Sequence, residues 1–196
     1  MLKKSLISSL KVLLVFTVTL GLIYPLVIYF IGQIFFYDKA AGSLYVRNGE
    51  VKGSFLIAQN FTGEKYFWPR PSYINFNPMP SGASNLGPTS KDLVQQYLLR
   101  KKNFIHLNFV NEQNEIPSEM LFASASGVDP DISKTSAMLQ IERVSKARNF
   151  DKLQKEKLHN LIDSLAEYPQ FGIFGSEIVN VLKLNIKLDD LSNKNE

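Results

Sequence analysis

The longest pattern in the chain is an apolar run near the N-terminus. Of the 25 residues from Val12 to Phe36, 17 are Leu, Ile, Val or Phe, and none is charged. Such a run favours insertion into lipid by about 5–10 kcal/mol before its polar groups are counted. As a helix it is about 37 Å long, more than the roughly 30 Å hydrocarbon core. Because a signal peptide has a shorter apolar core, we predict an uncleaved transmembrane helix over about 12–36.

Two features set the shape and direction of this helix. Pro25 lies inside it, and because proline lacks an N–H we expect a kink there. Lys3, Lys4 and Lys11 precede the run, and no lysine or arginine follows before Lys39. By the positive-inside rule the N-terminus lies in the cytoplasm. Residues beyond about 38 are therefore expected outside the cytoplasm.

A hairpin and an irregular segment follow the anchor. Residues 43–57 hold two short β-prone runs around Asn48-Gly49, a pair that favours the positive φ angles of a tight hairpin turn. Residues 59–85 hold four prolines and six aromatic residues without strand or helix periodicity. Because the prolines reduce chain entropy and the aromatic rings can bury area, we predict an ordered irregular loop.

Three later segments have helical spacing. The first covers 91–104 and begins at Thr89 or Ser90, either of which can cap it; residues 105–117 are expected to be a loop or helix tail. The second begins at Ser133, and the third near Asp151, three residues before Gln154 as in a capping box, and ends by Tyr168-Pro169. Their apolar faces consist of Leu93, Val94, Tyr97 and Leu98; Met138, Ile141 and Val144; and Leu158, Leu161, Ile162 and Leu165.

The C-terminal pattern alternates between apolar and polar residues. Apolar side chains occupy every second position from Leu182 to Leu188, which predicts a half-buried strand. The chain from Asp189 is polar and is expected to fray, with a flexible tail over 191–196. The predicted fold class is α+β: one transmembrane helix within residues 1–37, then a single small exoplasmic domain over 38–190 with long irregular loops.

Charge and composition exclude several function classes. The net charge is +4, and three of these charges belong to the lysines before the anchor, so the rest of the chain is nearly neutral. A nucleic-acid-binding body needs a basic face, so we expect no nucleic-acid partner. The absence of cysteine excludes disulfides and thiolate sites. His106 and His159 lack partners at metal-ligand spacing, and no common hydrolase or phosphate-binding motif occurs, so no catalytic set, metal or intrinsic cofactor is expected.

The stretch Ala123–Pro130 is expected to form a tight turn. Ser124 and Ser126 can bond backbone groups of the turn, and Gly127 can adopt a positive φ. A serine-dependent enzyme with Ser124 or Ser126 as nucleophile stays open as an alternative. Asp129 or Asp131 can pair with a cation, and the sequence offers Arg143 and Arg148 for this role.

Gln140, Arg143 and Ala147 share one face of the second predicted helix. The guanidinium has five N–H donors, enough to serve several loop carbonyls. We expect this face to tie the helix to the 59–85 loop.

A series of short motifs runs in order along the chain. They are Tyr24-Pro25, Gly42-Ser43-Leu44, Gly53 to Phe61, Tyr66-Phe67, Arg70-Pro71-Ser72, Ser84-Asn85-Leu86, Ser124 to Pro130, Gln140 to Val144, Lys146-Ala147-Arg148 and Val179 to Leu182. This series resembles the KdpC family, the C subunits of bacterial Kdp potassium-transporting P-type ATPases. Three positions depart from the usual pattern: Trp68-Pro69 replaces a histidine and a glycine, and Ala83 replaces a glycine.

The resemblance implies a non-catalytic accessory subunit of a high-affinity potassium uptake complex in the bacterial inner membrane. The implied partners are a channel-like potassium-binding subunit, an ATP-hydrolysing subunit and, as a third candidate, a further small membrane subunit. The family is described as a catalytic chaperone that raises the ATP affinity of the hydrolysing subunit, so ATP is a cofactor only by family attribution. From the topology we expect roles in assembly and at the potassium entrance instead.

The candidate structural and interface residues are those of the motifs. They are Pro25, Gln59, Asn60, Phe61, Arg70, Pro71, Ser72, Ser84, Asn85, Ser124, Ser126, Gly127, Asp129, Gln140, Arg143 and Arg148. A membrane-anchored binding module is a further alternative, with a stacking surface made of Phe61, Tyr66, Trp68 and Tyr73.

The predicted topology has a direct test. Protease added to intact cells should remove the C-terminal domain and leave the N-terminal segment protected, because the charge rule places only residues beyond about 38 outside. A domain that is cut only after the membrane is broken would contradict this orientation.

Overall fold

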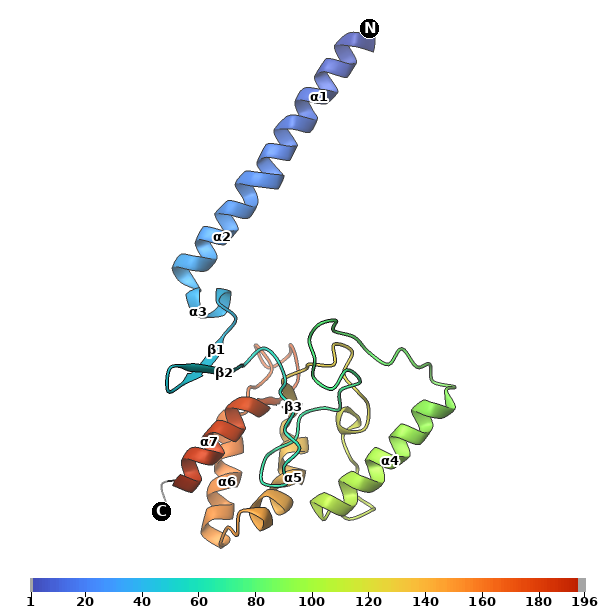
Figure 1. Ribbon diagram of the computed structural model, residues 1–196, viewed down its shortest axis with the longest axis vertical. Helices are drawn as coiled ribbons and strands as arrows, with labels where there is room; N and C mark the ends of the chain where they lie inside the picture. Colours follow the sequence, from blue (N-terminus) through green and yellow to red (C-terminus); the bar gives the residue numbers. More distant parts are fainter. Residues whose placement is uncertain (1, 194–196) are drawn as a thin grey trace. The chain divides into compact units, whose positions relative to one another are not determined.

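The computed structural model describes residues 2–193, and these form two compact units with the boundary between Leu44 and Tyr45. The first unit is one long helical segment followed by a short helix, α3 (Tyr37–Ala40) (Figure 1). The long segment, Leu2–Phe35, has a mean hydropathy of 2.3 and buries none of its side chains. An isolated apolar helix of this length fits a single-pass membrane protein.

Just before Pro25, where the sequence predicts a kink, the helix contains a π-helical turn. The α-helix α1 (Leu2–Val18) passes into the π-turn η1 (Thr19–Ile23), and α2 (Tyr24–Phe35) continues from there. The N–H of Tyr24 donates to the carbonyl of Thr19, five residues back, instead of four. Because Pro25 donates no hydrogen bond and its ring crowds the preceding turn, a wider turn accommodates it without ending the helix.

The second unit is an α+β domain, as the sequence predicts. Its elements in chain order are β1 (Leu44–Arg47), β2 (Glu50–Ser54), α4 (Lys91–Asn108), the 3₁₀ turn η2 (Ser118–Met120), β3 (Asp131–Ser133), α5 (Lys134–Ala147), α6 (Lys152–Leu165), β4 (Ile178–Asn180) and α7 (Val181–Asn193). β1 pairs with β2, and β3 pairs antiparallel with β4. The predicted hairpin is confirmed, with φ of 56° at Asn48 and 79° at Gly49.

The helix starts follow the capping signals in the sequence. The side chain of Ser90 accepts from the N–H of Leu93 and begins α4, and Ser133 accepts from Ser136 and begins α5. Asp151 caps α6 in a complete capping box with Gln154. These caps satisfy N–H groups that the first helical turn leaves without partners. α4 continues to Asn108, so the predicted helix tail is helical for four residues beyond Phe104.

The core lies between the three C-terminal helices and the β3–β4 pair. α6 contacts both α5 and α7, and Figure 1 shows the three helices gathered in one group, with α4 on the other side of α5. The fully buried apolar side chains come from every part of this group: Phe67, Ile132, Ala137, Ile141, Val144, Leu158, Ile162, Val179, Leu184 and Leu188. Phe67 is the member from the irregular loop, so that loop is part of the core.

The strand predicted over 182–188 is wrong, because this segment is the helix α7. The same residues also have helical spacing: Val181, Leu184 and Leu188 are buried together with the polar Asn185, whereas Ile186 is only half-buried. The side chain of Asn180 accepts from the N–H of Lys183 at 3.1 Å and caps the helix.

The predicted frayed end is also corrected by α7. Asp189 does not fray; it lies in the helix and accepts hydrogen bonds from Arg148 and Tyr66. Residues 191–193 of the predicted tail are helical, and 194–196 lie outside the described residues.

Two substitutions distinguish the helix from a strand at the C-terminus. Leu184→Ala should destabilise the domain by about 2–5 kcal/mol, the cost of a cavity at a fully buried leucine. Ile186→Ala should cost clearly less, although a strand would bury both side chains equally. Urea midpoints of the full chain, with Lys183→Ala as an exposed control, measure the difference. Equal losses of stability in the Leu184→Ala and Ile186→Ala variants would contradict the helix.

Candidate functional site

The loop 59–85 is irregular but anchored inside the domain. Residues 59–85 contain no helix or strand, yet Phe67 and Pro69 are buried. Buried irregular backbone needs partners for its N–H and C=O groups. The partners here are polar side chains of α5 and α7 and of Arg148, the residue that follows α5.

The central partner is Arg143 on α5, whose side chain is only 2% exposed. Its Nη1 donates to the carbonyls of Tyr66 (2.9 Å), Gly63 (3.5 Å) and Glu64. Its Nε donates to Oδ1 of Asn108 on α4 at 2.9 Å, and Nη2 donates to Oε1 of Gln140 at 2.7 Å. The predicted tie between this helix face and the loop carbonyls is therefore present.

Burial changes the electrostatics of Arg143 without removing its charge. Loss of water lowers its pKa to about 9, and the more distant charge of Glu64 opposes this shift. The value still lies above neutral pH, so the guanidinium stays charged and all its N–H groups donate. The Trp68 ring covers it, with the guanidinium carbon 3.6 Å from the ring centroid.

Two amide side chains pair with the loop as a neighbouring strand would. Oδ1 of Asn185 accepts from the N–H of Phe67 at 2.8 Å, and its Nδ2 donates to the Phe67 carbonyl at 3.0 Å. Gln140 repeats this pattern on Trp68, with distances of 2.8 and 3.2 Å. Each amide satisfies both backbone groups of one residue. We call Asn108, Gln140, Arg143 and Asn185 the Arg143 cluster.

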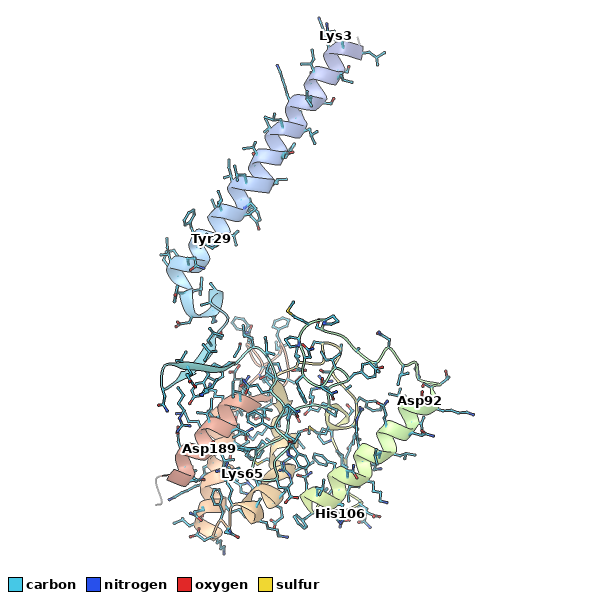
Figure 2. All side chains as sticks on the ribbon, in the orientation of Figure 1. Lys3, Tyr29, Lys65, Asp92, His106 and Asp189 are labelled. Carbon is cyan, nitrogen blue, oxygen red and sulfur yellow. The ribbon has the colours of Figure 1, made fainter. Side chains whose placement is uncertain are left out.

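Arg148 provides a second tie between the loop and the C-terminal helix. Its Nε donates to the carbonyl of Lys65 at 2.8 Å, and Nη2 pairs with Asp189 on α7 at 2.7 Å. Figure 2 shows Lys65 and Asp189 close together on one face of the domain. The hydroxyl of Tyr66 donates to Asp189, and burial, followed by the Asp189 charge, raises the pKa of Tyr66.

The partner predicted for Asp129, either Arg143 or Arg148, is wrong. Asp129 pairs with Arg70 of the loop at 2.7 Å, whereas Arg143 binds carbonyls and Arg148 binds Asp189. Sequence spacing could not reveal this pair, because 59 residues separate its members.

The turn 124–130 receives the other loop contacts. The N–H of Ser124 donates to the carbonyl of Pro71 at 3.1 Å, and the carbonyl of Ser126 accepts from Gly82 at 3.2 Å. Gly127 has a φ of +71°, as predicted, and a Cβ there would lie 2.4 Å from the side chain of Ile74. A larger residue would therefore displace the loop.

The remaining motif residues hold local conformations. Nε2 of Gln59 donates to the Lys52 carbonyl at 3.1 Å and lies where a Cβ at position 53 would be, so this contact requires Gly53. Further contacts of this kind are the Ser72 hydroxyl accepting from Phe76 at 2.9 Å, the Ser84 hydroxyl accepting from Leu86 at 3.5 Å and the φ of +54° at Asn85. Asn60 is exposed, and Pro25 lies in the N-terminal unit.

The described residues assemble neither the site of a serine-dependent enzyme nor a metal site. Ser124 is 2% exposed, and the Ser126 hydroxyl accepts from the N–H of Val128. In residues 2–193 no group of three His, Cys, Asp or Glu side chains could hold a metal ion. His106, near the C-terminal end of α4 (Figure 2), is exposed, as is His159.

The proposed aromatic stacking surface is largely occupied by the domain itself. The rings of Phe61 and Tyr66 pack against each other at 5.5 Å, and Phe61 also packs on the core. Trp68 covers Arg143, and its Nε1 donates to the Gly63 carbonyl at 3.0 Å. Tyr73 alone of the four is largely exposed, at 54%.

The apolar face predicted for α4 lines an open groove instead of the core. Within α4 the buried residues are Phe104 and Asn108, whereas Leu98 is 57% exposed. The groove has a volume of about 530 Å³ and is lined by Leu86, Pro88, Leu93, Val94, Tyr97, Leu98 and Phe122.

The sequence did not predict Asn185 and Asp189 as partners of the loop, or Asn108 as a partner of Arg143. Asn185 and Asp189 were not assigned to a helix face, because a strand and a frayed end were predicted there. Asn108 was not assigned to one, because the first helix was predicted to end at 104. Helical spacing from Val181 would have placed Asn185 on the buried face, one turn after Val181.

Comparison with known proteins identifies relatives of this chain. The family model described as "K+-transporting ATPase, c chain" matches residues 6–190. A protein from Bacteroides fragilis (strain YCH46) is 39% identical over 193 residues, which is 97% of this chain and 100% of the relative. A protein from Geobacter metallireducens is 43% identical over 94% of this chain and 96% of the relative. A protein from Mycobacterium tuberculosis (strain H37Rv) is 40% identical over 96% of this chain and 100% of the relative. Each relative is named "Potassium-transporting ATPase KdpC subunit".

A conservative substitution tests the Arg143 cluster. Arg143→Lys should destabilise the domain by about 2–5 kcal/mol, because an ammonium group cannot serve Asn108, Gln140 and the loop carbonyls together, and each acceptor left without a donor costs about 1–3 kcal/mol. Urea unfolding followed by the fluorescence of Trp68, the single tryptophan, measures it.

Arg47→Lys on the exposed strand β1 is the matched control and should change stability by less than about 0.5 kcal/mol. Equal midpoints for the two variants would show that the cluster does not hold the loop.

Proposed function

Because this chain belongs to the KdpC family, the c chains of the K+-transporting ATPase, we propose that it is a non-catalytic accessory subunit that assembles and stabilises an ATP-driven potassium uptake complex. The observation that carries the proposal is the family match over residues 6–190, which covers most of the apolar helix and nearly all of the α+β domain. The subunit is anchored in the bacterial inner membrane with its N-terminus in the cytoplasm and its domain outside.

The partners follow from this arrangement. A channel-like potassium-binding subunit and an ATP-hydrolysing subunit are the two principal ones, and a further small membrane subunit is the third candidate. The anchor supplies a helix for contacts within the membrane. The domain supplies a rigid surface at the potassium entrance, since the Arg143 cluster and the Arg70–Asp129 pair support an irregular loop in one conformation.

The place of the domain constrains any role of ATP. With the domain outside, cytoplasmic ATP does not reach it. We propose that an effect on ATP affinity passes through the assembled complex to the hydrolysing subunit, and that this subunit holds no nucleotide of its own. The buried positions of Ser124 and the Arg143 side chain support a structural role for these groups.

Purification from native membranes tests the proposal. In mild detergent, the tagged chain should travel with two larger membrane proteins and with potassium-stimulated ATP hydrolysis. Arg70→Ala should lower the yield of this complex several-fold, because it leaves Asp129 without its cation and loosens the loop from the turn 124–130.

Arg47→Ala, an exposed arginine on β1, is the control and should leave the yield unchanged. A tagged chain that purifies alone would overturn the accessory role. A stable, fully assembled complex of the Arg70→Ala variant that had lost ATP turnover would overturn the structural role of Arg70.

A further inference from the structure

The connection between α6 and β4 carries an exposed apolar tip. In the segment 168–174, which we call the 168–174 tip, the side chains of Tyr168, Phe171, Ile173 and Phe174 are 63%, 91%, 77% and 68% exposed. No charged residue occurs between Glu167 and Glu177. A cluster of large apolar side chains this exposed is uncommon on a soluble surface and marks an interaction site.

The tip is held in a defined shape. At its base, Glu167 and Ile178 exchange backbone hydrogen bonds of 2.8 and 3.0 Å, and nearer the turn Gln170 and Phe174 do the same at 2.8 and 3.0 Å. Between them Phe171 has a φ of +54°, a conformation that is unfavourable for a bulky side chain. The backbone therefore holds an aromatic ring outward at the turn, which is the shape of a protrusion and not of a groove.

The base of the tip is tied to the domain by Lys134, whose ammonium group also pairs with Asp163 at 3.0 Å. Glu177 pairs with Lys134 at 3.1 Å, and the same ammonium group lies 5.8 Å from the centroid of the Tyr168 ring. Beyond this base the side chains are apolar except for Gln170 and the Tyr168 hydroxyl. Such a surface offers few hydrogen bonds and no ion pair to a protein partner.

The tip lies at the end of the domain that receives the chain from the anchor. Figure 1 shows the connection after α6 at the same end of the domain as β1 and β2, and Asn180, the last residue of β4, donates to the carbonyl of Phe55 just after β2 at 2.8 Å. Nine residues lie between Phe35, the end of the apolar helix, and Tyr45, the first residue of the domain. Even fully extended, that connection spans at most about 35 Å, and the short helix α3 shortens it.

We propose that the 168–174 tip inserts its aromatic and apolar side chains into the lipid headgroup region of the membrane that holds the anchor. Aromatic residues favour this interface, where a ring meets acyl chains and a hydroxyl meets water. Apolar side chains on a surface element reach about 5–10 Å into the boundary between headgroups and acyl chains. The domain then has two attachments to the bilayer, the covalent anchor and the tip, which restrict its rotation above the membrane. This inference requires the anchor but not the potassium pump.

Single cysteine labels test the contact, since the chain contains no cysteine. A nitroxide label is attached to the cysteine of the Phe171→Cys variant. The labelled full chain is embedded in nanodiscs of phosphatidylethanolamine and phosphatidylglycerol. Lys157→Cys, on the exposed face of α6, is the control position. Oxygen partitions into lipid and should relax the label at 171 several-fold more effectively than the label at 157. A water-soluble nickel complex should relax the label at 171 several-fold less effectively than the label at 157.

A charged tip provides the second arm. In a chain that also carries Ile173→Asp and Phe174→Asp, the label at 171 should become as accessible to the nickel complex as the label at 157, because aspartate disfavours insertion. An unchanged spectrum of the label at 157 verifies that the domain stays folded.

Three results would overturn the inference. The first is equal access of the nickel complex to the labels at 171 and 157 when the tip is not charged. The second is exclusion of both oxygen and the nickel complex from the label at 171, which indicates a protein contact. The third is a label at 171 that stays exposed to lipid in the charged variant. Because only the chain and lipid are present, none of these results bears on the accessory role in the pump.

Discussion

The domain depends on the burial of one guanidinium group. Moving the Arg143 charge out of water is costly, and the lowered pKa of about 9 reflects that cost. It is offset by hydrogen bonds from every nitrogen of the group and by the Trp68 ring stacked on it. Most of these acceptors are carbonyls of the 59–85 loop, so the charge and the loop conformation stabilise each other. A lysine could not replace this arginine, because the acceptors lie in several directions around a planar group.

The Arg143 cluster also explains how a long irregular segment enters a core without becoming a strand. Asn185 and Gln140 each satisfy the N–H and C=O of one loop residue, as the edge of a sheet would, and Phe67 can then be buried between the helices. Asn185 lies 118 residues from Phe67, and Asp189 lies 123 residues from Tyr66. The loop is therefore complete only when the last helix has packed, and the domain is expected to fold as one cooperative unit.

These constraints suit a subunit whose work is done by its shape. Several of its motif residues lie at contacts within the domain: Arg70 with Asp129, Gln59 against Gly53, and Ser126 with Gly82. Among the described residues, two apolar surfaces that the domain leaves exposed are the groove along α4 and the 168–174 tip. Such surfaces are available for contacts with other subunits of the K+-transporting ATPase.

Local sequence determined the elements whose signals are local. The length and apolarity of residues 12–36 predicted the long helix, Asn48-Gly49 predicted the hairpin, and Ser90, Ser133 and Asp151 predicted three helix starts, since each signal acts within a few residues. The tie between Arg143 and the loop was also predicted, because Gln140 and Arg143 share one helix face and a guanidinium has enough donors for several loop carbonyls. Tertiary structure decided the rest. The residues from Leu182 to Leu188 fit the strand period and the helix period alike, and the helix forms because it buries Leu184 and Leu188 while placing Asn185 on the Phe67 backbone. Likewise the pairing of Arg70 with Asp129 and of Arg148 with Asp189 depends on segments that meet only in the folded chain, which is why no spacing in the sequence could specify them.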